Sequence, residues 1–154
     1  MNRLIALLFL GACAVAAVKG YMEAEPLLDQ EVDPRLETPL RHWQQDVDQT
    51  RLIWRARFAR VKSIGVKPLP AGWTGLYDQW SRRLWVSPER LSAGPYSTRA
   101  TLYHELGHGV FLLKHSSCRL MGPALEEEYY REHWSALVQE YLMAADTQAK
   151  KRSE

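Results

Sequence analysis

The chain has 154 residues, a formal charge of +2, and 46% hydrophobic and 25% charged residues. This length has room for one compact domain, and the composition excludes a disordered chain and a protein with several membrane spans. The charge is too small and too dispersed to indicate nucleic-acid binding, because the one basic cluster, residues 150–152, lies at the tail and is typical of a solvated end.

Residues 1–18 begin with a short positive stretch and continue with an apolar run, which is the pattern of an export signal. The apolar part is about fifteen residues long, fewer than the roughly 20 that span a bilayer. Leu10-Gly11-Ala12-Cys13 resembles the bacterial lipobox, which implies that Cys13 is acylated and becomes the mature N-terminus. Ala14 is the residue type that lets such a lipoprotein proceed to the outer membrane, so we expect a lipid-anchored protein of the bacterial cell envelope that faces the periplasm. The alternative is an ordinary cleaved signal with a chance cysteine.

Residues 19–37 are rich in Glu, Asp and Pro and have little apolar periodicity, so they are expected to form a tether. The remaining residues, 38–154, are expected to form the domain. Thr38-Pro39 is a good helix start, and apolar residues then recur with helical spacing as far as Val61, which predicts one long amphipathic helix ending near Gly65.

The segments 73–77 and 83–87 are separated by a polar stretch and predict a β-hairpin. Ser97 or Thr98 is expected to cap a helix that runs through the histidines after it, with Gly109 inside that helix or just past its end. Pro123 is expected to begin the last helix, whose first turn carries Glu126 to Glu128. The order helix, hairpin, helix, loop, helix predicts a single α+β domain.

His104-Glu105-Leu106-Gly107-His108 is an H-E-x-x-H motif on a segment that is expected to be helical. Residues four apart lie on one helix face, so both imidazoles can bind one Zn²⁺ ion. Glu105 is offset from that face, where a carboxylate can take a proton from zinc-bound water. A structural zinc site needs no such carboxylate, and its presence favours a hydrolase.

The sequence leaves the third zinc ligand open. His115 follows His108 by seven residues, and in an unbroken helix it would lie about 10 Å further along the axis. The helix would therefore have to end early for His115 to bind, and Gly109 is the residue in the interval that turns freely. The rival is Glu128, on the last helix; weaker candidates for a role at the site are Cys118, His133, Tyr129 and Tyr130.

The run from His104 to His115, followed by Met121-Gly122-Pro123, resembles the extended zinc motif and methionine turn of the metzincins, and most closely small bacterial metzincin-like lipoproteins. The resemblance implies a zincin-like domain in which His104, His108 and His115 bind zinc and Glu105 is the base. It also implies that Met121 forms a hydrophobic floor beneath the metal. The chain differs from the usual motif by a gap of seven rather than six before the third histidine, and by Phe111 in place of a glycine.

These features predict a zinc-dependent hydrolase, with Zn²⁺ as cofactor and a peptide or protein as substrate. Two alternatives stay open: a catalytically inactive zinc-binding or structural lipoprotein, and a zinc hydrolase of cell-wall amides.

Overall fold

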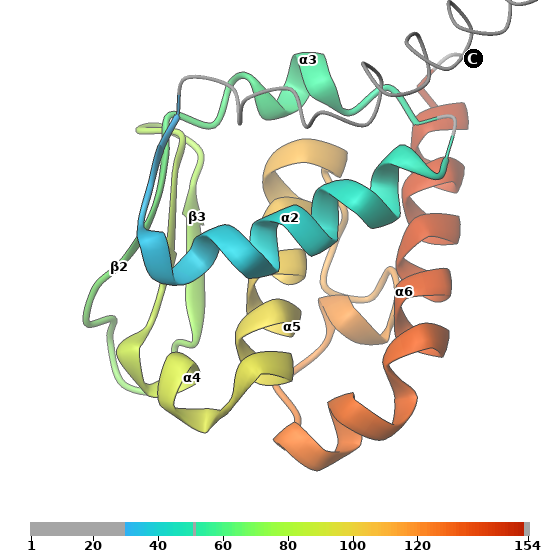
Figure 1. Cartoon of the computed structure of the whole chain (residues 1–154). Helices are drawn as coiled ribbons and strands as arrows, with labels where there is room; N and C mark the ends of the chain where they lie inside the picture. The colour runs from blue at the N-terminus through green and yellow to red at the C-terminus, as the bar shows by residue number, and fades with distance from the viewer. Residues whose placement is uncertain (1–29, 51, 153–154) are drawn as a thin grey trace, which may run out of the picture.

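A computed structural model describes residues 30–50 and 52–152 (Figure 1). The predicted signal, the lipid attachment at Cys13 and most of the tether lie outside these residues. In the described part, five α-helices and a four-stranded mixed sheet form an α+β domain, as predicted. The elements are, in chain order, β1 (Glu31–Val32), α2 (Pro34–Asp48), α3 (Arg55–Phe58), β2 (Ser63–Val66), β3 (Gly75–Asp78), β4 (Arg83–Val86), α4 (Pro88–Ala93), α5 (Pro95–Leu106), a π-helical turn (Gly107–Phe111), a 3₁₀ turn (Arg119–Met121) and α6 (Glu127–Lys150).

The sheet has the strand order β1-β2-β4-β3. The predicted hairpin is confirmed, because β3 and β4 pair antiparallel, with Gly75 opposite Val86. β2 pairs with β4 in parallel, and β1 adds to β2 in parallel as well. Figure 1 shows the sheet on one side of α5 and α6 on the other, with α2 crossing α5, which contacts all three of these layers. α5 is therefore the central helix.

The domain begins earlier than expected, because β1 and the start of α2 lie within residues assigned to the tether. The first helix starts at Pro34 rather than at Thr38, and its N-cap is Asp33, whose side chain accepts a hydrogen bond from the N–H of Arg35 at 3.0 Å. Pro39 then lies inside the helix. The periodicity of this region is weak at its N-terminal end, and the parallel pairing of β1 with β2 links residues that are far apart in the sequence.

The single long helix predicted from Thr38 to Gly65 is wrong. α2 ends at Asp48 and only the short α3 follows, while Gly65 lies in β2. The hydroxyl of Thr50 donates to the carbonyl of Val47 at 2.6 Å and accepts from the N–H of Leu52 at 3.2 Å, and such side-chain bonds compete with helix continuation. The break lets Trp54 turn back onto Trp43, with ring centroids 5.2 Å apart.

The core is centred on the fully buried Trp43. Its ring packs against those of Phe58 and Phe111, and its indole N–H donates to the phenol oxygen of Tyr141 at 3.1 Å. Tyr141 in turn packs on Phe111 and on Tyr103 of α5. This aromatic core joins α2, α3, the π-helical turn and α6, and so supports the segment that carries the H-E-x-x-H motif. Among the described residues, none of the helices combines the length and the hydropathy of a membrane span.

The start of α5 is capped by a residue far away in the sequence. The helix begins at Pro95, and Gly94 at the N-cap has no side chain to offer, so neither Ser97 nor Thr98 is the cap. The carboxylate of Glu127 accepts from the N–H groups of Tyr96 at 3.1 Å and Ser97 at 2.6 Å. α6 correspondingly begins at Glu127 rather than at Pro123.

Replacing Glu127 with glutamine is expected to lower the free energy of unfolding by about 1–2 kcal/mol at neutral pH, because a charged cap of α5 is lost. Burial raises the pKa of Glu127, but the hydrogen bonds from Ser97 and Tyr96 outweigh it and hold that pKa below its usual 4.5. A lowered folded-state pKa stabilises the fold above about pH 4.5 and loses that contribution as the pH falls through it. Urea unfolding at pH 7 and pH 3 measures this, and an equal loss at both pH values would contradict the capping role.

Candidate metal centre

The H-E-x-x-H motif lies where α5 passes into the π-helical turn. His104 and Glu105 are in the last turn of α5, and His108 is in the π-helical turn Gly107–Phe111. The chain then reverses at Leu112, which has a left-handed conformation (φ 59°), and the N–H of Leu113 donates to the carbonyl of Gly107 at 2.9 Å. The reversal ends the helix. This is the early end that His115 needs in order to reach the other two histidines.

Gly109, the turn residue expected from sequence, lies inside the π-helical turn. Leu112 makes the reversal instead. A π-helical turn accommodates an extra residue within a helix. The turn therefore gives a physical account of the seven-residue gap between His108 and His115, one longer than the metzincin spacing.

The three predicted histidines come together. The Nε2 atom of His108 lies 3.1 Å from Nε2 of His104 and 3.1 Å from Nε2 of His115. One nitrogen from each ring lies within 4.8 Å of the other two. Tetrahedral zinc with bonds of about 2.05 Å separates its nitrogen ligands by about 3.4 Å, so the spacing of this His triad is close to that of a zinc site.

Backbone carbonyls orient two of the rings. Nδ1 of His104 is 2.9 Å from the carbonyl oxygen of Leu120, and Nδ1 of His108 is 2.8 Å from that of Leu113. A carbonyl only accepts, so both Nδ1 atoms carry the proton and both Nε2 atoms present lone pairs. Two lone pairs that face each other at this distance repel, and a cation between them removes the repulsion.

Burial favours the neutral form of both histidines, which a metal ligand needs. It lowers the pKa of His104 to about 4, opposed by the hydrogen bond to Leu120, and it also lowers the pKa of His108. His115 is exposed on the loop that follows Leu113. The triad therefore combines two half-buried, oriented rings with one exposed ring.

Met121 lies beside the triad, in the 3₁₀ turn that also carries Leu120. It is fully buried and packs so tightly on Gly107 that a Cβ atom there would lie 2.5 Å from its sulfur. The neighbouring Arg119 holds the turn on α6 through a two-pronged ion pair with Glu140, and it also donates to Tyr129 at 2.9 Å. The 3₁₀ turn therefore positions two groups: the Met121 side chain, which packs on Gly107, and the Leu120 carbonyl, which orients His104.

Glu105 is buried against the edge strand β3, with 6% of its surface exposed. It fits because Gly75 has no side chain: a Cβ there would lie 2.7 Å from a carboxylate oxygen of Glu105. Burial raises the pKa of Glu105 to about 7, opposed by a hydrogen bond from the backbone of Tyr77. A carboxyl group with such a pKa can exchange a proton near neutral pH.

The motif opens into a cleft of about 570 Å³. Its lining residues are Gly72–Tyr77, His104, Glu105, His108, His115 and Gly122–Ala124. One wall is thus β3, an edge strand, and the other is the segment after Met121. Tyr77 also lines this cleft, although it is not among the site residues predicted from the sequence. The signal that could have identified it is its position in the predicted strand 73–77, in the hairpin that precedes the motif helix.

The rival ligand and the weaker candidates lie elsewhere. Glu128 is exposed and ion-paired with Arg131, and it is not part of the His triad. Tyr129 accepts from Arg119 and stacks on the exposed His133, while Tyr130 is buried and accepts from the N–H of Leu125. None of these side chains lines the cleft.

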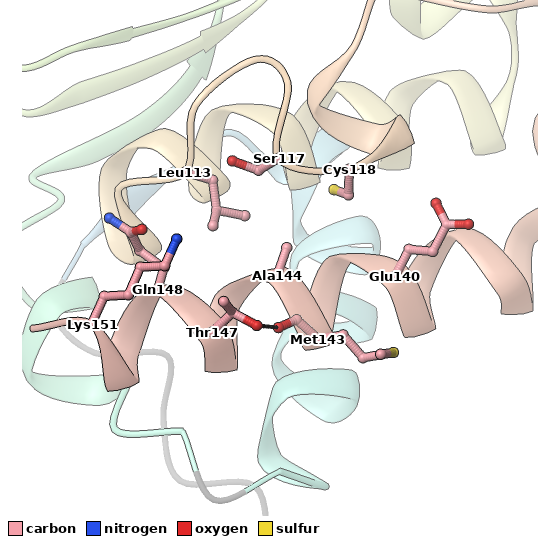
Figure 2. Close-up of a pocket in the computed structure, with 9 residues that line it drawn as sticks. All are labelled: Leu113, Ser117, Cys118, Glu140, Met143, Ala144, Thr147, Gln148 and Lys151. Carbon is pink, nitrogen blue, oxygen red and sulfur yellow. Dashed lines mark hydrogen bonds between the residues drawn. The ribbon is translucent and has the colours of Figure 1, made fainter.

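Cys118 lines a second hollow, of about 400 Å³, between the loop after Leu113 and α6 (Figure 2). Burial raises the pKa of its thiol. Figure 2 shows the other walls of the hollow, formed by α6 side chains from Glu140 to Gln148 and by Lys151. The hollow shares no lining residue with the cleft, so Cys118 does not belong to the His triad.

Comparison of the chain with family models, with curated proteins and with solved structures found no match. The functional argument therefore depends on the site itself.

Proposed function

We propose that the chain is a zinc-dependent peptide hydrolase of the zincin type, similar to the metzincins. The observation that carries this proposal is the approach of two unprotonated Nε2 atoms, those of His104 and His108, to 3.1 Å, with a third histidine equally close to His108. A cation satisfies this arrangement, and three imidazoles are a donor set that suits zinc and leaves a coordination position open.

When bound, zinc would lower the pKa of water and polarise a carbonyl group. The protein residues would do the rest. His104, His108 and His115 would hold the ion, and Glu105 would accept the proton from the attacking water and later pass it to the leaving amine. The burial of Glu105 against β3 supports this role, because it restricts the carboxyl group to one position beside the triad.

β3 offers a site for an extended substrate. It is an edge strand and lines the cleft, so a peptide can add to the sheet there through backbone hydrogen bonds. Tyr77, on the same strand, has a pKa raised by burial and keeps its phenol proton, which makes it a candidate donor to the oxygen of the scissile carbonyl. A lipid at Cys13 would keep this activity at the envelope, with the outer membrane as the proposed location.

The experiment is a peptide digest by the full-length protein in detergent micelles, with new N-termini counted by mass spectrometry. Cleavage is expected to stop after treatment with a zinc chelator and to return with stoichiometric Zn²⁺ but not with Mg²⁺, because the triad offers nitrogen donors. Purified peptidoglycan serves as a second substrate. Zinc-dependent release of cell-wall fragments without peptide cleavage would show that the substrate is a cell-wall amide rather than a peptide. Zinc binding without either reaction would show that the zinc site is structural.

A further inference from the structure

A basic surface lies at the end of the molecule where β2 and β4 begin. It comprises Arg60, Lys62, Trp80 and Arg82, and is called here the basic face. The N–H of Lys62 donates to the carbonyl of Arg82 at 2.8 Å, which joins the segment after α3 to the turn between β3 and β4. Figure 1 shows α3 at this end of the molecule, beside the ends of the strands.

Within the described residues, the cations of the basic face make no ion pair. Arg60, Lys62 and Arg82 are exposed, and none of them makes an ion pair with another described residue. Residues 52–83 contain seven lysines and arginines but one acidic residue, Asp78. Glu31 lies opposite Ser63 at the same end of the sheet, and it offsets part of this charge together with Asp78. The three cations of the face outnumber these two carboxylates, so the face keeps a positive potential.

Asp78 instead shapes the turn that presents Trp80. Its carboxylate accepts from the N–H of Trp80 at 3.0 Å and from the hydroxyl of Ser81 at 2.6 Å. Trp80 is 96% exposed. An exposed tryptophan among cations is typical of a surface that binds the interface of an anionic membrane.

The chain enters the domain at the same end. The side-chain amide of Gln30, the first described residue, donates to the carbonyl of Phe58 at the end of α3, at 2.8 Å. Any segment that precedes Gln30 therefore joins the domain beside the basic face. Cys13, the predicted lipid attachment, is 17 residues before Gln30.

We propose that the basic face lies against an anionic phospholipid surface, with Arg60, Lys62 and Arg82 on the headgroups and Trp80 in the interface. This contact is separate from any lipid on Cys13 and does not depend on the proposed hydrolase activity. It would give the domain one fixed orientation on the membrane rather than leaving it free on a tether. Nucleic acid shares the negative charge, but the nearby chain entry, which leads back to the predicted lipid attachment, favours a membrane.

The test uses full-length protein in vesicles of brominated phosphatidylcholine, with or without phosphatidylglycerol. Trp80→Phe isolates the emission of Trp80, as the difference from the wild-type spectrum. Quenching of this emission by the bromine atoms is expected in the anionic vesicles and not in the zwitterionic ones, and 1 M salt is expected to abolish it because the Debye length falls to about 3 Å. A lipid on Cys13 alone would act equally in both vesicles.

Each cation near an anionic membrane contributes about 1 kcal/mol, a factor of about five, so Arg60→Glu with Arg82→Glu should lower the equilibrium constant for contact by about 25-fold or more. The matched control is Arg41→Glu with Arg131→Glu, which makes the same change in charge at exposed ion pairs on α2 and α6 and should leave the quenching unchanged. Equal quenching in both vesicles, or equal effects of the two double variants, would overturn the proposal. So would an unquenched Trp80 in a protein that binds a DNA duplex through Arg60 and Arg82.

Discussion

Replacing Glu105 with glutamine is expected to abolish peptide hydrolysis, with a loss of about 10²–10⁴-fold in kcat, while zinc binding persists. The amide has nearly the shape of the carboxyl group, so it fits against Gly75 and can still accept the hydrogen bond from the backbone of Tyr77. It cannot accept a proton. The loss should therefore appear in kcat rather than in zinc content.

Hydrolysis and zinc are measured on the same preparation, by peptide cleavage and by elemental analysis. Glu128→Gln is the control, because it neutralises an exposed carboxylate outside the cleft. Full activity in Glu105→Gln would refute the role of Glu105 as base. Loss of zinc from this variant would show instead that the carboxylate helps to hold the metal.

Removal of His115 is expected to lower the affinity for zinc by more than the roughly 10–100-fold that follows loss of a hydrogen-bond partner of a ligand. His115→Ala deletes one of the three nitrogens that meet, whereas the carbonyls that orient His104 and His108 remain. Because His115 is exposed on a loop, its loss should leave the fold intact, which circular dichroism can check.

Glu128→Ala provides the comparison, since Glu128 was the rival ligand in the sequence. Its exposed ion pair with Arg131 contributes little to stability, and zinc affinity measured against a chromophoric chelator should not change. If Glu128→Ala lost zinc and His115→Ala kept it, the geometry of the triad would not be that of the metal site.

Much of the site could be predicted because it depends on local spacing. His104 and Glu105 are on a helix as expected, and helical periodicity alone brings His108 near His104. The hairpin was also readable, since two apolar segments with a polar turn between them pair locally, and here β3 pairs with β4. These features depend on neighbours within a few residues.

The errors came from contacts between distant residues. Helical spacing from Leu40 to Val61 suggested one helix, but the packing of Trp54 on Trp43 requires a break that periodicity cannot register. The sequence predicts Ser97 or Thr98 as the cap of α5, whereas the cap is Glu127, some thirty residues later. The basic face could not be predicted for the same reason: Lys62 and Arg82 are twenty residues apart in the sequence, and strand pairing brings them together.

The α+β class, the hairpin and a carboxylate beside two histidines one turn apart can all be predicted from residue order, because they follow from short-range backbone geometry. The position of His115, rather than Glu128, beside the other two histidines follows from the tertiary structure. That outcome depends on a π-helical turn and a left-handed Leu112, whose conformational cost is met by the burial of Val110, Phe111 and Leu113 in the core. The balance between the cost of this backbone conformation and the burial of its neighbours depends on the whole packed fold, so a local pattern of residues does not predict it.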